Sequence, residues 1–198
     1  LYRPFKEKKK TKATEAIKNG LEPLAKMIMS FKISQDIDEV AKKFINENVK
    51  TKEDAIMGAS YIIAEWISDN AYYRKSVRQF TYHNGIITSK KKKNAEDVNK
   101  IYEMYYDYKE AVKYVKPHRI LAMNRGEKEK ILTVNIDVDK DKIISYLEGK
   151  IIKDEKSKAT PVVKMAILDS YKRLIQPSIE REIRSELSEK AEEVAIDN

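Results

Sequence analysis

The sequence predicts a mainly α fold, a multi-helix domain with one small β element near residues 131–138. Apolar residues recur at the three- and four-residue spacing of amphipathic helices through most of the 198 residues. Only the stretch from Leu132 to Val138 alternates strictly between apolar and polar side chains, which is the period of a strand. Capping residues, glycines and prolines also stand where helices would begin and end.

Start and stop signals define the helices expected in the first part of the chain. Residues 13–19 are expected to form a short helix that ends at Gly20, because glycine readily adopts the left-handed conformation found after helices. The next helix begins at Leu21, and Pro23 is tolerated in its first turn. Thr51 is a suitable N-cap for a longer helix, because its hydroxyl can accept a hydrogen bond from the first turn.

Apolar stripes indicate which helical faces are buried. A partner helix is expected over residues 72–82, followed by a loop over 86–94 that could hold a short strand at 86–88. Each stripe is expected to pack on the core as one face of a helix. The stripes are Ile37, Val40, Ala41, Phe44 and Ile45; then Ala55, Ala59, Ile62, Ile63 and Trp66; then Ile101, Met104, Tyr105, Tyr108 and Val112.

The strand near 131–138 lies between two further helices. Pro117 is expected to start the helix before it, and Gly126 to close that helix. Asp139 is expected to cap the helix after it. A single strand cannot satisfy its own backbone groups, so this one must pair with residues 86–88 or with a segment outside the chain.

The chain is expected to divide into three parts. Residues 1–12 form a basic extended segment, residues 13–152 a central helical domain, and residues 153–198 the C-terminal helices, the last of which begins at Pro177. The first residue is Leu1 and not Met, which indicates a piece of a longer protein.

The composition excludes some classes of protein. The chain has a net charge of +8 and no cysteine, so neither a disulfide framework nor a zinc-thiolate site is expected. No apolar run approaches the roughly 18 residues that a membrane-spanning helix needs. We therefore expect a cytoplasmic protein without a membrane partner.

The positive charge is concentrated in two segments, which are candidate nucleic-acid contacts. Clustered lysines release counterions from a nucleic acid, so binding would be salt-dependent and independent of sequence. The alternative interpretation is that the lysines only form a solvated surface. That alternative is favoured for the second segment, whereas both interpretations stay open for the first. The first segment could also pair with acids of the C-terminal helix. The candidate residues are Arg3, Lys6, Lys8, Lys9, Lys10 and Lys12, and then Lys90, Lys91, Lys92 and Lys93; the acids are Glu180, Glu182, Glu186 and Glu189.

No set of residues predicts catalysis, a metal site or a cofactor. One group of acids has the spacing of a calcium loop, namely Asp137, Asp139, Asp141 and Glu148. Lys142, however, stands where that loop needs glycine. Phosphate-binding glycine loops and nucleophile motifs are absent from the sequence. We therefore expect no enzyme activity in this chain, and no catalytic residue, metal or cofactor.

A tyrosine cluster allows two interpretations. It consists of Tyr102, Tyr105, Tyr106 and Tyr108. Exposed tyrosines could stack on bases, whereas the spacing favours one buried helical face with hydroxyls at its rim. Core packing is the preferred interpretation.

Four strings follow one another along the chain in an order that identifies a family. They are Tyr2-Arg3-Pro4-Phe5-Lys6 through Gly20-Leu21-Glu22-Pro23-Leu24-Ala25; Glu53-Asp54-Ala55 with Gly58-Ala59 and Ile62-Ile63-Ala64-Glu65; Tyr105-Tyr106-Asp107-Tyr108 with Glu110; and His118-Arg119-Ile120-Leu121-Ala122 with Asn124-Arg125-Gly126-Glu127. Together they resemble the Tex family of bacterial transcription accessory proteins. Residues 158–196 are similar to the helical stretch that follows in that family.

The resemblance implies a place in a larger architecture. The chain would be the central helical part, with helix-turn-helix-like packing, located just before a YqgF domain of ribonuclease-H-like fold. The YqgF domain, the helix-hairpin-helix motifs and the S1 domain of the family fall outside this sequence. No catalytic residue is implied for the chain itself.

The function expected from the residues and the resemblance together is that of a scaffold and nucleic-acid-associated module. Its partners would be RNA or DNA, contacted at phosphates independently of sequence, the transcription machinery, and other domains of the same parent chain. The alternative is a protein-interaction module that docks on the transcription or translation machinery or on its parent's own domains.

Overall fold

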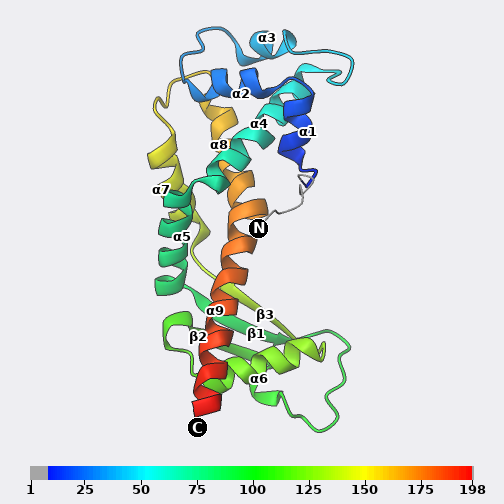
Figure 1. Ribbon diagram of the computed structural model, residues 1–198, viewed down its shortest axis with the longest axis vertical. Helices are drawn as coiled ribbons and strands as arrows, with labels where there is room; N and C mark the ends of the chain where they lie inside the picture. Colours follow the sequence, from blue (N-terminus) through cyan, green and yellow to red (C-terminus); the bar gives the residue numbers. More distant parts are fainter. Residues whose placement is uncertain (1–8, 198) are drawn as a thin grey trace, which may run out of the picture. The chain divides into compact units, whose positions relative to one another are not determined.

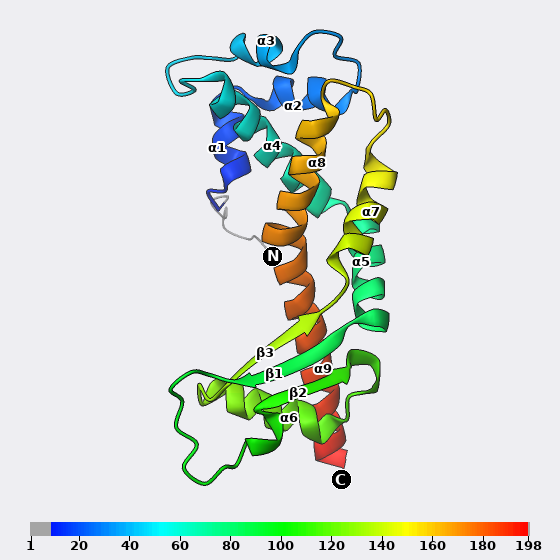
Figure 2. The same cartoon turned by 180° about the vertical axis from the view of Figure 1, so that it is seen from behind.

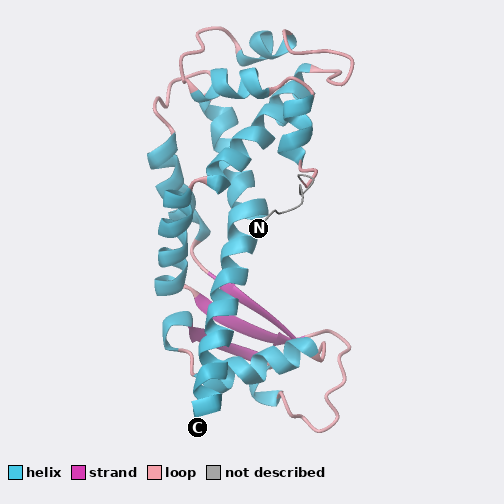
Figure 3. Ribbon diagram, in the orientation of Figure 1, coloured by secondary structure: helices cyan, strands magenta, loops and turns pink. Residues whose placement is uncertain are grey.

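Residues 9–197 are described by the computed structural model, and they belong to two compact units. The first unit comprises residues up to Ala71 together with Ile144–Ile175, and the second comprises Tyr72–Ile143 together with residues from Gln176. Both are built mainly from helices, and the second also holds a small antiparallel sheet (Figures 1 and 3). The predicted fold class is therefore confirmed.

The three parts predicted from sequence, 1–12, 13–152 and 153–198, stay a prediction. No helix in the described part of the chain is both long enough and apolar enough to cross a membrane.

The first unit is a group of helices around α4, which contacts α1, α2, α3 and α8 (Figure 1). Its elements are α1 (Lys12–Lys18), α2 (Glu22–Met29), α3 (Ile37–Lys42), α4 (Lys52–Asp69), the end of α7 (Lys140–Ile151), α8 (Thr160–Asp169) and the π-helical segment η3 (Ser170–Ile175). Small residues on α4 let its neighbours approach closely. A Cβ added to Gly58 would lie 2.2 Å from Leu21 Cδ1 and 3.4 Å from Ala16 Cβ.

The predicted start and stop signals of this unit are confirmed. Gly20 follows α1 with a φ of +86°, and Pro23 lies in the first turn of α2. Thr51 caps α4, where its hydroxyl accepts a hydrogen bond of 3.0 Å from the Asp54 amide. Two residues of the predicted stripes are less buried than expected. Ile45 is 43% exposed because α3 ends at Lys42, and Trp66 is 36% exposed, as is common for a side chain of its size.

The second unit packs helices against one face of a three-stranded antiparallel sheet, with strand order β2-β1-β3. Its elements are α5 (Ala71–Asn84), β1 (Ile86–Lys91), η1 (Glu103–Tyr105), β2 (Asp107–Ala111), η2 (Val112–Tyr114), α6 (Pro117–Lys128), β3 (Leu132–Asp137) and α9 (Gln176–Asp197). Burial alternates along β3, so one face of the sheet is covered and the other is exposed. Seen from behind in Figure 2, the strands lie in front of α6 and α9.

The predicted strand is confirmed, and β1 is the partner that it needs. Ile87 pairs with Ile136, and Ser89 pairs with Val134. The partner strand is longer than the segment 86–88, because it continues through Lys91. Asp139 caps the helix that follows the strand, since its carboxylate accepts from the Asp141 amide at 3.1 Å.

The prediction of one buried helical face over residues 101–112 is wrong. This stretch holds the short helix η1 and the strand β2, which pairs with β1. Tyr105 and Val112 are buried, whereas Ile101 is 67% exposed and Met104 is 54% exposed. Pairing with β1 overrides the helical spacing, because strand formation depends on neighbours more than on local preference.

Gly126 does not close its helix, so that prediction is also wrong. The helix α6 continues through Lys128, and the positive φ of 63° falls on Lys130. Gly126 instead allows a close approach, since an added Cβ would lie 2.4 Å from Leu132 Cδ1 and 3.2 Å from Tyr102 Cδ1.

Pro177 does not start a separate helix. The helical conformation runs without a break from α8 through η3 into α9. A proline inside a helix lacks the amide that would donate to the preceding turn, and its ring crowds the carbonyl there. The wider turns of the π-helical segment just before Pro177 accommodate this defect.

Side chains of α9 satisfy the outer edge of β3. The Ile136 amide donates to the Glu180 carboxylate, and the Arg184 guanidinium donates to the Val134 carbonyl at 3.3 Å. Glu180 and Arg184 are one helical turn apart, so a single face of α9 serves both backbone groups.

Candidate nucleic-acid interface

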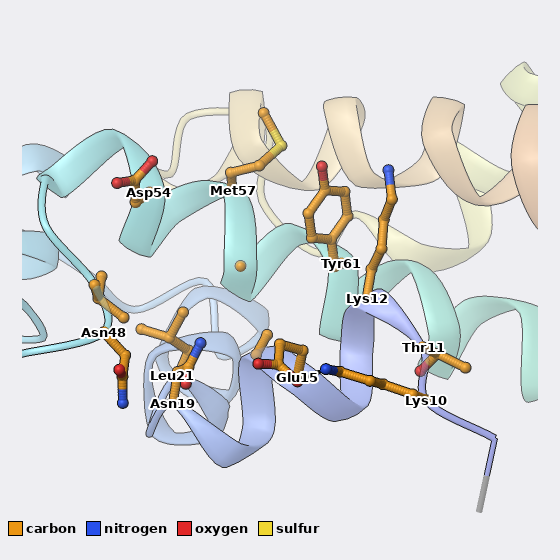
Figure 4. Close-up of a pocket in the computed structure, with 13 residues that line it drawn as sticks. Lys10, Thr11, Lys12, Glu15, Asn19, Leu21, Asn48, Asp54, Met57 and Tyr61 are labelled. Atoms are coloured by element: carbon orange, nitrogen blue, oxygen red, sulfur yellow. Dashed lines mark ion pairs between the residues drawn. The ribbon is translucent and has the colours of Figure 1, made fainter.

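The described lysines of the first basic segment, Lys9, Lys10 and Lys12, lie at the start of α1, and Figure 4 shows Lys10 and Lys12 there. Arg3, Lys6 and Lys8 are outside the described residues. Lys9 is exposed and has no side-chain partner among the described residues. Lys10 and Lys12, by contrast, each have a partner within the unit. The Lys10 ammonium lies 3.6 Å from the Glu15 carboxylate, and the Lys12 ammonium lies 4.8 Å from the centre of the Tyr61 ring.

A capping box fixes these lysines to the body of the unit. The Thr11 hydroxyl accepts from the Thr14 amide at 3.0 Å, and the Thr14 hydroxyl accepts from the Thr11 amide at 2.7 Å. The Thr11 hydroxyl also lies 3.0 Å from the Glu65 carboxylate on α4, to which it can donate. This reciprocal pattern satisfies the first amides of a helix, so α1 begins at a defined residue beside the lysines.

An open cavity of about 550 Å³ is lined by residues of α1, of α4 and of the loop before α4 (Figure 4). Its charged side chains are Lys10, Lys12, Glu15 and Asp54, so both signs are present. Such a rim can attract an anion through the lysines, but the two acids reduce the attraction.

Tyr61 was not identified from the sequence as part of this site. The centre of its ring lies 5.3 Å from the Arg173 guanidinium as well as 4.8 Å from the Lys12 ammonium. The Arg173 guanidinium donates hydrogen bonds to the Asp169 carboxylate, the shorter of them 2.8 Å long, and these raise the pKa of Arg173. Met57, Tyr61 and Glu65 follow one another at four-residue intervals, so the sequence places them on one face of a helix, but the contact of that face with the segment is a feature of the fold.

The second basic segment belongs to the other unit. Lys90 and Lys91 are the last two residues of β1, and Lys92 and Lys93 follow it, so most of the predicted loop 86–94 is a strand. All four residues are exposed. The Lys91 ammonium lies 5.6 Å from the centre of the Tyr106 ring. The side chains of Lys90, Lys92 and Lys93 make no ion pair or hydrogen bond with any residue of 9–197.

The connection from β1 to β2 is held in place by Asp97. Its carboxylate accepts hydrogen bonds from the Ile101 amide at 3.1 Å, the Tyr102 amide at 2.8 Å and the Tyr106 hydroxyl at 2.7 Å. Burial raises the pKa of Asp97, but these hydrogen bonds and nearby Lys91 outweigh it and hold that pKa below its usual value. The same hydrogen bond to Asp97 raises the pKa of Tyr106 to about 12.

The tyrosine cluster is mainly structural, as preferred from the sequence, although it lies on no single helical face. Tyr102 and Tyr105 are buried, and the Tyr105 and Tyr108 rings meet edge to face at 5.4 Å between centres. Tyr108 also receives a hydrogen bond of 3.0 Å from Arg119, which pairs with Glu110 at 3.1 Å. These contacts tie β2 to α6.

A third cationic surface was missed by sequence reasoning. It is a cleft of about 310 Å³ between α5 and α9, and the residues of α5 that line it recur at helical spacing. The lining residues are Lys75, Arg78, Gln79, Tyr82 and His83 on α5, with Ile183, Glu186 and Lys190 on α9. The side chain of Lys75 has no partner among the described residues, but the other cations of the cleft are paired with acids.

Two of the candidate acids of α9, Glu182 and Glu186, have partners within their own unit. Arg74 and Arg78 both pair with Glu182, at 3.1 and 3.5 Å, and Arg78 also pairs with Glu186. A hydrogen bond from Lys190 lowers the pKa of Glu186, and Arg78 adds to the effect. These pairs account for two of the four acids that were possible partners of the N-terminal lysines.

The string from Asn124 to Glu127 has a structural role. The Arg184 guanidinium lies 2.8 Å from the Glu127 carboxylate and donates to the side-chain amide oxygen of Asn124 at 3.0 Å. Arg125 makes no ion pair with a residue that the structure describes. No cluster of three or more metal-ligating side chains occurs within residues 9–197.

Three relatives and one family place the chain among known proteins. Residues 32–198 match the family described as Tex central region-like. The protein YdcI of Bacillus subtilis (strain 168) is 52% identical over 199 residues, which cover 99% of this chain and 28% of that protein.

More distant relatives have descriptive names. Transcriptional accessory protein Tex of Neisseria gonorrhoeae is 30% identical over 141 residues, which cover 71% of this chain and 18% of that protein. S1 RNA-binding domain-containing protein 1 of Homo sapiens is 27% identical over 210 residues, which cover 98% of this chain and 21% of that protein. The chain therefore spans less than a third of each of these three relatives.

Proposed function

Because the chain belongs to the Tex central region-like family, we propose that it is the central module of a longer transcription accessory protein and binds nucleic acid at phosphates. One relative is named a transcriptional accessory protein and another is named for an RNA-binding domain, and both names support this class of partner. Binding of this kind is independent of base sequence, because phosphates carry no base information.

The observation that carries the proposal is the end of β1. Lys90, Lys92 and Lys93 are exposed, adjacent and without a side-chain partner among the described residues. A lysine that is already paired must give up its partner to bind a phosphate, whereas these three keep their full charge available. Each phosphate that they neutralise would release counterions and so add to the salt dependence of binding.

The N-terminal segment is proposed as a second, weaker contact. Lys10 and Lys12 are partly committed to Glu15 and Tyr61, so only part of their charge is available to a phosphate. Lys9 has no such commitment. Arg3, Lys6 and Lys8 are included in the proposal on the basis of the sequence alone.

The experiment is fluorescence anisotropy of the chain with a labelled single strand of DNA or RNA at several salt concentrations. The variant Lys90→Gln/Lys92→Gln/Lys93→Gln should bind more weakly, with a salt slope smaller by about 2. The matched control is Lys153→Gln/Lys156→Gln/Lys158→Gln, which removes the same charge from exposed lysines that also lack side-chain partners among the described residues. Equal losses of affinity for the two variants would show that binding depends only on net charge, and this result would overturn the proposed site.

The remaining parts of the proposal are a scaffold role and the absence of catalysis. The ion pairs of Arg119 with Glu110 and of Arg184 with Glu127 link separate elements of the second unit, and they support a rigid body that holds neighbouring domains of the parent chain. We propose that this part of the parent acts by binding alone. Hydrolysis of nucleic acid by the isolated chain, lost when its own residues are changed, would overturn that proposal.

A further inference from the structure

Three large apolar side chains stand in solvent on the connection between β1 and β2. Val98 is 87% exposed, Ile101 is 67% exposed and Met104 is 54% exposed. A single exposed apolar residue is ordinary, but three within seven positions of one connection indicate a surface that another molecule covers. Figure 1 shows this connection as a long loop that extends beyond the end of the sheet.

The exposure of these side chains is a property of an ordered loop. Asp97 accepts three hydrogen bonds from the loop, and the Ser89 hydroxyl on β1 donates to the Tyr105 carbonyl at 2.8 Å. Tyr102 and Tyr105 are 4% and 6% exposed, so they anchor the loop between the exposed residues. An ordered apolar surface loses little conformational entropy when it binds, which favours its use as a contact.

The charges around the loop indicate the kind of partner. The side chains of Lys92, Lys93 and Lys100 have no partner among the described residues. The connection also carries the acids Glu96, Asp97 and Glu103, and the carboxylate of Asp97 is occupied by the loop itself. A partner that suits both the lysines and the apolar side chains needs negative charges next to apolar faces, and a single-stranded nucleic acid offers phosphates next to unpaired bases.

We propose that this loop contacts the bases of a single-stranded nucleic acid through Val98, Ile101 and Met104, while Lys92, Lys93 and Lys100 contact the neighbouring phosphates. The proposal rests on the proposed function, because it names the part of the nucleic acid that the second basic segment meets. A duplex hides the faces of its bases, and inserting apolar side chains between them requires unstacking, so the single strand is the favoured partner.

The test compares two strands of equal length and charge, one with bases and one built from abasic residues. The chain should bind the base-bearing strand more tightly at high salt, where phosphate contacts are weakened. The variant Val98→Ala/Ile101→Ala/Met104→Ala should bind the base-bearing strand about tenfold more weakly. Its affinity for the abasic strand should not change.

The matched control is Val194→Ala/Ile196→Ala/Met165→Ala, which removes the same side chains from other exposed positions. It should leave both affinities unchanged. The circular dichroism spectrum and the melting temperature of each variant establish that it is folded.

Several results would overturn the proposal. One is equal affinity for the base-bearing and the abasic strand. Another is an unchanged affinity of the loop variant for the base-bearing strand, which would indicate that the apolar residues contact a protein surface, such as another domain of the parent. Equal affinity for a duplex of the same charge would reduce the contact to phosphates and would also overturn it. Failure of the chain to bind any strand at low salt would instead overturn the proposed function itself.

Discussion

The two basic segments have similar compositions but different surroundings. At the start of α1, Lys10 lies beside Glu15 and Lys12 lies over Tyr61, so the unit uses part of their charge internally. At the end of β1, Lys90, Lys92 and Lys93 have no partner among the described residues. A count of lysines therefore does not rank binding sites. What ranks them is the charge left over after internal pairing.

The largest expected effect comes from destabilising, one at a time, the unit that carries each basic segment. Gly126→Ala should destabilise the second unit by about 2 kcal/mol, because the added Cβ would lie 2.4 Å from Leu132 Cδ1 in the packed core. Gly58→Ala should act on the first unit in the same way, through Leu21. Thermal unfolding measures the size of the loss, and hydrogen exchange shows which unit has loosened.

Gly149→Ala is the control for both glycines. It lies in α7 with nothing within 4 Å of an added Cβ, so alanine should stabilise the protein by about 0.5–1 kcal/mol through helix propensity. If Gly126→Ala and Gly58→Ala each loosened both units equally, the two segments could not be treated as independently supported.

The next effect ranks the two segments directly. Lys90→Gln/Lys92→Gln/Lys93→Gln should weaken binding to a single strand about tenfold at low salt. Lys9→Gln/Lys10→Gln/Lys12→Gln removes the same charge but should weaken binding only about threefold, since two of its lysines already have partners. Anisotropy titrations at one low salt concentration measure both. A larger loss for the N-terminal variant would reverse the ranking.

A smaller effect tests how the first segment is fixed. Thr11→Ala removes one hydroxyl of the capping box and its contact with Glu65, and should cost about 1 kcal/mol. Thr11→Ser keeps the hydroxyl and is the control. Hydrogen exchange of the α1 amides should increase in the alanine variant alone, and equal exchange in both variants would show that the cap does not hold α1.

The smallest effect concerns the loop after the second segment and depends on pH. The pKa of Asp97 is lower in the folded protein than its usual value of 3.8, so the folded state favours the carboxylate. The stabilisation is therefore complete above the usual pKa and is lost as the pH falls through the lower pKa of the folded state. Wild type should melt above Asp97→Asn at pH 7, and this difference should shrink below about pH 3.8. If the difference in melting temperature stayed constant down to pH 2, the stabilisation would come from the packing of the Asp97 side chain and not from its charge.

Local signals predicted much of the first unit and one strand of the second. Gly20, Thr51 and Asp139 have the roles predicted from the sequence, because a helix cap or a left-handed residue depends on only a few neighbouring atoms. The alternation of Leu132–Asp137 also predicted a strand, because one of its faces is buried and the other is exposed.

Features that depend on distant neighbours could not be predicted in this way. Strand β2 (Asp107–Ala111) is set by pairing with β1, and its sequence carries little strand preference. The role of Gly126 depends on the approach of Leu132 and Tyr102, and the helix through Pro177 depends on the π-helical segment before it. In the candidate site, the lysines were identified from the sequence, but Tyr61, Arg173 and Asp97 become relevant only through three-dimensional contacts.

The contacts of α9 with β3 have a consequence for how the protein behaves at high concentration. An exposed strand edge is a template on which another chain can add a strand and begin to aggregate. Here Glu180 receives the Ile136 amide and Arg184 donates to the Val134 carbonyl, so two side chains occupy the places that an incoming strand would need. The helix thus closes that side of the sheet to growth and protects the protein from self-association through β3.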